Sequence, residues 1–277
     1  AVDIDPDGKS VWAADRCGSN SCAGSTVDPI VKLDANGNIL KMFGAGQILW
    51  PHGMDVDKQG NVWVVDARVP TADELKKFPD WANKGNTVLK FSPDGKLLLT
   101  LGSGGKTGNP PEAFTEPNDV VVGPDGSIYV SESHSAQFID APTPEAVGRI
   151  SKFSPDGKFI KSFGSYGYGP SQFRGPHSLA FDSKNRLFVA DRGNRRIQVF
   201  DTEGKYLREF TIDVPVDTKR GKIVYGAETP NAKTGSQAPG APAVLDEREP
   251  DRTNDVESAR HVAVEYGDAQ LLGDRPL

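Results

Sequence analysis

The sequence predicts an all-β protein of the β-propeller class, built from a four-stranded unit that occurs four times. Three observations lead to this prediction. One hairpin motif recurs through the first 210 residues, a second hairpin motif follows each copy, and the turn-forming residues glycine (30) and proline (21) are abundant. A propeller blade consists of four strands. Each blade buries its faces only against neighbouring blades, so the unit must repeat.

The first hairpin of each unit passes a turn that contains Asp-Gly or a similar pair. Its second strand then ends in an acidic residue. The four copies cover residues 4–15, 56–66, 122–132 and 181–191. Asp-Gly and related pairs accept positive φ angles, which tight hairpin turns require.

The second hairpin of each unit has its copies at residues 31–37, 89–95, 150–157 and 197–204. Three of these copies close on a glycine, at Phe43-Gly44, Leu101-Gly102 and Phe163-Gly164. The longer units carry their extra length in two loops, at residues 69–87 and 133–148. Loops that grow while strands keep their length often carry function.

The pattern ends after Phe210. Residues 213–277 contain no Asp-Gly hairpin, and much of this stretch is rich in Pro, Gly, Ala and charged residues. We therefore assign residues 1–212 to propeller blades. Residues 213–277 are expected to form an irregular C-terminal segment, either a degenerate fifth blade or a non-native tail. A six-bladed ring of such units would exceed 277 residues, so we expect an incomplete ring.

The bulk composition excludes some functions. The formal charge is −6, so no general attraction to nucleic acid or to an anionic membrane is expected. No stretch reaches the roughly 18 apolar residues of a membrane span. A small-molecule or peptide substrate is the expected partner.

The two cysteines, Cys17 and Cys22, lie in one short Gly/Ser/Asn loop. They could remain free thiols, but we favour a local disulfide, which would require an oxidising compartment. A thiolate metal site is not expected from two cysteines without a nearby histidine.

Two of the four histidines share a motif. His52 and His177 each follow a proline just before the first strand of their unit, the second and the fourth. In a six-bladed propeller, alternate blades lie about 120° apart, so both imidazoles could converge on one metal near the axis. Three protein ligands and an open position are usual for catalytic zinc. The alternative is that Pro-His only turns the chain, with the imidazole bonded to backbone.

Two arginines also share a position. Arg16 and Arg192 each follow the Ala-Asp that ends the second strand of their unit, and Arg68 and Glu132 lie near equivalent positions. These charges could simply be solvated. A guanidinium group is, however, well suited to a carboxylate substrate.

These segments resemble a known enzyme family. Pro51-His52-Gly53, Pro117-Asn118-Asp119, Pro176-His177-Ser178 and the run from Phe188 to Gln198 are similar to peptidyl-α-hydroxyglycine α-amidating lyases, which are NHL-repeat propellers. The resemblance covers about residues 2–210.

The resemblance implies a six-bladed NHL propeller with catalytic zinc on three histidines and a structural calcium ion. It implies cleavage of a peptidyl hydroxyglycine to a peptide amide and glyoxylate, and an extracytoplasmic (secreted or periplasmic) location. By position, His52 and His177 would be zinc ligands, while Arg16 and Arg192 would be active-site arginines.

The sequence departs from the family at two places. The family's catalytic tyrosine falls on His134, which could act as a base with a different pKa and reach. The third zinc histidine belongs to a sixth blade. Arg260-His261-Val262 resembles that motif, but it follows His177 too closely, and Val262 replaces a calcium-binding aspartate. His261 is thus the candidate third ligand, and we expect the lyase activity to be impaired.

Two other functions stay open. The chain could be a non-catalytic NHL propeller that binds a peptide, protein or glycan. It could also be a calcium-dependent lactonase-like hydrolase, although that activity calls for acidic and Asn ligands on the axis. A binding propeller needs no metal, so a measurement of metal content separates it from the two enzymes.

Overall fold

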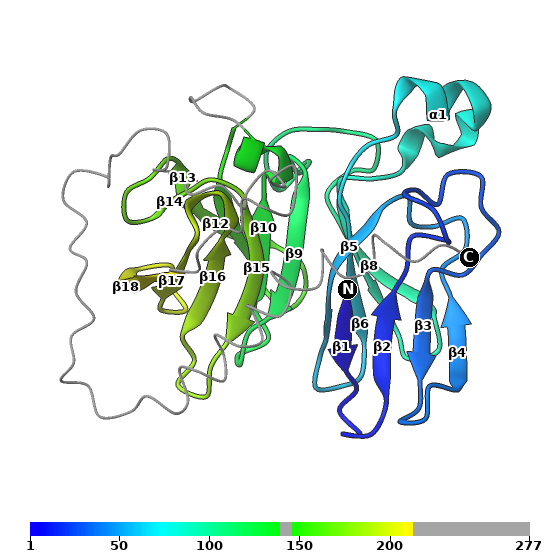
Figure 1. Ribbon diagram of the computed structural model, residues 1–277, viewed down its shortest axis with the longest axis horizontal. Coiled ribbons are helices and arrows are strands. Elements are labelled where there is room, and N and C mark those ends of the chain that lie inside the picture. The colour runs from blue at the N-terminus through cyan, green and yellow to red at the C-terminus, as the bar shows by residue number, and fades with distance from the viewer. Residues whose placement is uncertain (139–145, 213–277) are drawn as a thin grey trace, which may run out of the picture. The chain divides into compact units, whose positions relative to one another are not determined.

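Figure 1 shows the computed structural model, which describes residues 1–138 and 146–212. Four four-stranded sheets follow one another along the chain, and in each sheet the strands are hydrogen-bonded in chain order. Neighbouring strands such as β1 and β2, β5 and β6, β9 and β10, and β15 and β16 pair antiparallel. The predicted all-β fold of four propeller-type blades is confirmed.

The strand bounds match the repeated hairpins closely. The first sheet contains β1 (Val2–Ile4), β2 (Val11–Ala14), β3 (Ile30–Leu33) and β4 (Ile39–Phe43). The second contains β5 (Pro51–Val56), β6 (Val62–Asp66), β7 (Thr87–Phe91) and β8 (Leu97–Leu101). The third contains β9 (Pro117–Val122), β10 (Ile128–Glu132), β11 (Arg149–Phe153) and β12 (Phe159–Phe163). The fourth contains β15 (Pro176–Phe181), β16 (Leu187–Asp191), β17 (Arg196–Phe200) and β18 (Tyr206–Thr211).

The aspartate that begins the first-hairpin turn has a structural role in the first and second sheets. Asp5 is buried, and its carboxylate accepts a hydrogen bond from the Trp12 indole at 2.8 Å and pairs with Lys32 at 2.6 Å. The second sheet repeats this set with Asp57, Trp63 and Lys90. A buried carboxylate must be paired, so one aspartate ties three strands of its sheet together.

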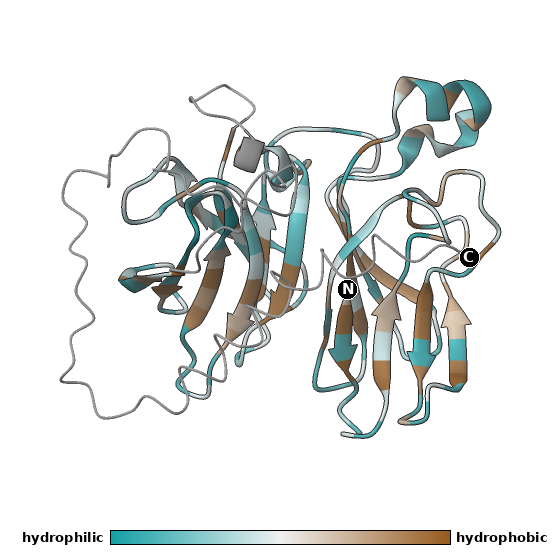
Figure 2. Cartoon of the chain, viewed as in Figure 1, coloured by the Kyte–Doolittle hydropathy of each residue, from teal (hydrophilic) through white to brown (hydrophobic). Residues whose placement is uncertain are grey.

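The chain divides into two compact units. The first comprises Ala1–His134 and Ile150–Ser162. In its core, Trp12 packs against Phe43 within the first sheet, and Phe43 packs against Phe91 of the second sheet. Figure 2 shows the matching hydrophobic segments along the strands.

The inner strands of the first unit are joined from sheet to sheet. The Asp3 carboxylate accepts from the Val56 amide at 2.6 Å, and the Asp55 carboxylate accepts from the Val122 amide at 3.1 Å. Gly53 permits close approach of β5 to β9, because a Cβ atom there would lie 2.5 Å from the Asp119 Cα. These contacts fix β5, whose second residue is His52.

The second unit comprises Ser135–Arg149 and the chain from Phe163 onward. Its described part contains the fourth sheet and a short parallel pair, β13 (Ser165–Tyr166) and β14 (Gln172–Phe173). A cluster of Phe188, Ala190, Ile197 and Val199 forms its core. The segment 213–277, predicted to be irregular, lies outside the described residues.

The loop at residues 69–87 contains more structure than the sequence predicted. It includes α1 (Ala72–Lys77) and a 3-10 turn, η1 (Pro79–Asn83). Thr71 caps α1 through a capping box with Glu74, which satisfies amide groups at the helix start. Within residues 1–138 and 146–212, no helix has the length and apolar character needed to cross a membrane.

Candidate functional site

In the second, third and fourth sheets, the acidic residue that ends the second strand organises the loop before the inner strand. The Asp66 carboxylate accepts from the amides of Leu49, Trp50 and Gly85 at 2.7–3.0 Å. Asp191 and Glu132 accept in the same way from the Arg174 and Thr115 amides. This repeated acid is therefore a positioning group, and in the second sheet it fixes Trp50.

Trp50 is the centre of the candidate site in the first unit. The guanidinium carbons of Arg16 and Arg68 lie 3.8 Å and 5.7 Å from the centroid of its ring. The rings of His52 and His134 lie 5.3 Å and 5.6 Å from it, centroid to centroid. Two arginines and two histidines thus meet around one indole. Sequence reasoning missed Trp50, although it directly precedes the Pro51-His52 motif.

His52 is held in one tautomer. Its Nδ1 atom lies 2.8 Å from the carbonyl oxygen of Asn118. A carbonyl only accepts, so Nδ1 carries the proton and donates. In a neutral ring, Nε2 then keeps the lone pair that can bind a metal, the usual arrangement for a metal-ligating histidine. The backbone-bonded imidazole considered from the sequence is therefore compatible with a ligand role.

His134 lies beside His52. It begins η2 (His134–Phe138), and the preceding Ser133 has a positive φ of 85°. The amides of Ser133 and His134 both donate to the Glu116 carbonyl, which fixes the turn. The two imidazole centroids are 5.1 Å apart, and one ligand nitrogen of each ring lies within 4.8 Å of the other. The first unit thus presents two imidazoles that could share one metal ion.

Arg16 is half-buried and lies over the indole. Its Nε donates to the Pro51 carbonyl at 3.1 Å, and Nη1 donates to the Asn20 side chain at 2.9 Å. Asn20 also accepts from the Trp50 indole at 3.3 Å. Burial lowers the pKa of Arg16, and the nearby charge of Arg68 lowers it further. The guanidinium group remains charged, because arginine does not deprotonate in proteins.

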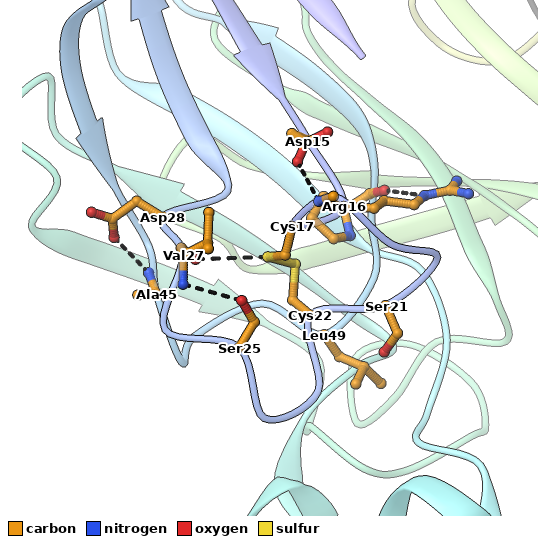
Figure 3. The surroundings of a disulfide bond; sticks show 12 residues. Asp15, Arg16, Cys17, Ser21, Cys22, Ser25, Val27, Asp28, Ala45 and Leu49 are labelled. Atoms are coloured by element: carbon orange, nitrogen blue, oxygen red, sulfur yellow. Dashed lines mark hydrogen bonds between the residues drawn. A yellow bond between two sulfur atoms is a disulfide. The ribbon is translucent and has the colours of Figure 1, made fainter. Parts of the chain in front are cut away.

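The predicted disulfide between Cys17 and Cys22 is confirmed, with a Cα–Cα distance of 5.3 Å. Figure 3 shows that this bond lies next to Arg16. Cys22 is buried in a cluster with Leu49 and Trp81, and its amide donates to the Leu49 carbonyl. The disulfide therefore anchors the loop that carries Arg16 to the segment that carries Trp50.

Arg68 is fixed by the inserted helix. Its Nη1 and Nη2 atoms donate to the two Glu74 carboxylate oxygens at 2.7 Å and 2.8 Å. The guanidinium of Arg68 holds the pKa of Glu74 well below its usual range. The sequence placed Arg68 near the repeated strand-end position, but not at a shared aromatic ring.

The other predicted site residues lie in the second unit or beyond it. His177 is the second residue of β15, as His52 is of β5, and it is half-buried. Arg192 begins η3 (Arg192–Asn194), directly after β16. Its amide donates to the Gly175 carbonyl, as the Ala67 amide does to the Trp50 carbonyl. His261 lies outside the described residues.

A family model for the NHL repeat matches residues 173–200, which include β15 and β16 of the second unit. A solved structure of virginiamycin B lyase from Staphylococcus aureus has a TM-score of 0.48 and 17% identity, covering 77% of this chain and 55% of that one.

Two curated relatives are named for α-amidation. The mouse peptidyl-glycine α-amidating monooxygenase is 35% identical over 192 residues, which is 66% of this chain and 17% of the mouse protein. A Drosophila melanogaster peptidyl-α-hydroxyglycine α-amidating lyase is 29% identical over 178 residues, which is 60% of this chain and 28% of that protein. The chain spans less than a third of the length of either. The chain therefore carries an NHL repeat and is related in sequence to peptidylglycine α-amidating monooxygenases and α-amidating lyases.

Proposed function

We propose that this protein is a metal-dependent lyase that cleaves a peptidyl α-hydroxyglycine to a peptide amide and glyoxylate. The observation that carries the proposal is the pair His52 and His134 beside Arg16, all at the ring of Trp50. The pair offers a metal site, and Arg16 offers a partner for the substrate carboxylate. Similarity to proteins named as α-amidating enzymes points to the same reaction.

His52, His134 and His177 are the proposed metal ligands, and zinc is the proposed metal. Imidazole nitrogen suits zinc, and three such ligands leave a position for substrate. The Nδ1 bond from His52 to the Asn118 carbonyl is the outer-shell contact such a ligand needs. His177 is included because it occupies in β15 the position of His52 in β5. Bound zinc would supply a Lewis acid that lowers the pKa of the substrate hydroxyl.

His134 is proposed as a ligand rather than as the base expected from the sequence. Its ring packs directly against the ring of His52, at 5.1 Å between centroids. A third ligand from within residues 1–212 also makes His261 unnecessary. His134 occupies the position of the family's catalytic tyrosine. As a metal ligand it could not also act as the base, so slow turnover is expected.

The chain's own residues bind and orient the substrate. Arg16 would pair with the carboxylate of the α-hydroxyglycine, and Arg192 would be a second cation near it. In the reaction, the hydroxyl loses its proton and its electrons form the carbonyl of glyoxylate. The C–N bond breaks, its electron pair goes to nitrogen, and nitrogen takes up a proton to give the amide.

The test exploits the four histidines of the chain. Each is changed to alanine, zinc is measured by elemental analysis, and glyoxylate release is measured from a peptidyl α-hydroxyglycine. His52→Ala, His134→Ala and His177→Ala are expected to lose zinc and activity, whereas His261→Ala, the matched control, keeps both. Zinc loss in His261→Ala with zinc retained in His134→Ala would reject this ligand set. Absence of both zinc and glyoxylate release from the wild-type chain would reject the lyase proposal.

An extracytoplasmic location is also proposed. A disulfide persists in oxidising compartments, and Cys17–Cys22 is such a bond. Expression in the periplasm and in the cytoplasm of the same bacterium, followed by thiol titration under denaturing conditions, tests this. Stable folding with both thiols free in the cytoplasmic product would argue against it.

A further inference from the structure

Two guanidinium groups lie against the ring of Trp50. Arg16 and Arg68 are the only arginines before Arg149 in the sequence, yet both lie against the same ring. Like charges repel, so holding the two guanidinium groups at one ring costs free energy. Cation–π attraction to the indole offsets only part of that repulsion. The pair therefore indicates an anionic ligand.

Acidic partners inside the protein do not neutralise the pair. The Nη1 and Nη2 atoms of Arg68 donate to the carboxylate of Glu74. The Glu74 side chain is 17% exposed. Arg16 forms no salt bridge with any described residue, because its acceptors are the Pro51 carbonyl and the Asn20 side-chain oxygen. The exposed Asp15 carboxylate acts on Arg16 only as a nearby charge. Arg16 therefore has no directly paired carboxylate beside Trp50.

Each guanidinium also keeps donors that no described residue uses. A guanidinium has five N–H groups in a planar fork. The Nη2 of Arg16 donates to no described residue, and the same holds for the Nε of Arg68. While Glu74 is bound to Nη1 and Nη2, the Nε–H and the second N–H of Nη2 can still form a bidentate pair with another carboxylate.

We propose that Arg16 and Arg68 together bind one carboxylate group of the substrate, with Trp50 as the floor of the site. This inference rests on the proposed function, because the carboxylate is that of the α-hydroxyglycine. It adds Arg68 as a specificity-determining residue and Trp50 as a contact surface. Glu74 is a positioning residue, since it reaches the ligand only through Arg68.

The inserted helix explains why Arg68 is held ready. Glu74 is the third residue of α1, and its carboxylate also accepts from the Thr71 amide in the capping box. Arg68 is thereby fixed at both Nη atoms before a ligand arrives. Fixing a long side chain in advance removes the entropy cost of ordering it on binding.

The test measures binding without turnover. Hippurate, an N-acylglycine without the hydroxyl, serves as the probe, and hippuramide, its neutral amide, as the control ligand, both by titration calorimetry on the full chain. Wild type is expected to bind hippurate and not hippuramide. Arg68→Gln is expected to weaken hippurate binding about tenfold or more, the usual effect of losing a charged hydrogen bond. Lys77→Gln, which removes an exposed positive charge from α1, is the matched control and should bind as wild type.

Two further measurements keep the inference falsifiable. Arg68→Lys keeps the charge but not the planar fork, so intermediate affinity with unchanged thermal unfolding supports the clamp. Hippurate binding by Arg68→Gln equal to that of wild type overturns it, as does equal binding of hippurate and hippuramide by wild type. The titrations are repeated on His52→Ala. Binding that depends on Arg68 in this background supports the clamp independently of the metal. If wild type also releases no glyoxylate while this binding is retained, the clamp stands and the lyase proposal fails.

Discussion

Trp50 is the residue on which most contacts of the candidate site converge, because two guanidinium groups and two imidazoles meet its ring. Trp50→Ala is expected to weaken hippurate binding about tenfold and to reduce stability by about 2 kcal/mol, since a half-buried aromatic surface is lost. Trp50→Phe keeps a ring under both guanidinium groups and should lose much less of either. Calorimetric binding and chemical unfolding measure the two effects. Equal losses in both variants would show that the ring face is not the contact.

The buried carboxyl group of Asp66 makes the free energy of unfolding depend on pH. Burial raises its pKa to about 6, although the amides of Leu49, Trp50 and Gly85 act in the opposite direction. An unfolded aspartate titrates near about 3.9. Because the folded pKa is higher, the stabilisation from the extra proton is complete below about pH 4 and is lost as the pH rises through about 6.

Asp66→Asn tests this assignment. The amide cannot accept all three N–H groups, so the variant is expected to be less stable than wild type by about 2 kcal/mol near neutral pH. It also lacks the titrating proton, so its deficit should be largest near about pH 4 and smaller at about pH 7. Thermal unfolding of both proteins across this range measures the difference. A deficit that increases with pH would contradict the raised pKa.

At the scale of elements, the disulfide loop after β2 supports the arginine site. Replacing Cys17 and Cys22 together by alanine is expected to reduce stability by about 2 kcal/mol, the entropy effect of a short closed loop. The variant should also bind hippurate more weakly, because the Cys17–Cys22 bond holds Arg16 near Trp50. Treating wild type with dithiothreitol should reproduce both changes, and treating the variant should change neither. Unaltered hippurate affinity in the reduced protein would separate the disulfide from the site.

The hairpins could be predicted from sequence and the Trp50 cluster could not, for a physical reason. A hairpin is fixed by residues close in sequence, such as Asp5 and Gly8 at one turn, so its signal is local. The contacts of Trp50 join residues from separate sheets and from an insertion, whose place depends on packing. Pro51-His52 was recognisable because the motif repeats at Pro176-His177, whereas Trp50 has Gly175 at the matching position. Arg68 was placed near a strand end, where a solvated charge is the common outcome.

At the scale of the whole molecule, the proposed metal would add to the stability of the folded chain. His52 and His134 belong to the first unit. A metal bound only by the folded chain at about 100 times its Kd stabilises it by about 2.7 kcal/mol. Its removal by a chelator should therefore lower the unfolding midpoint of the first unit.

Tryptophan fluorescence can report this stabilisation in the first unit, because all four tryptophans, Trp12, Trp50, Trp63 and Trp81, belong to it. Added zinc is expected to raise the fluorescence-detected unfolding midpoint of wild type. His52→Ala should abolish that rise, because it removes one imidazole of the pair at Trp50, and His261→Ala should keep it. If His52→Ala responds to zinc as wild type does, the pair is not the zinc site. If no protein responds, the imidazole pair at Trp50 does not bind zinc, and the anion clamp of Arg16 and Arg68 must be judged by the hippurate titrations alone.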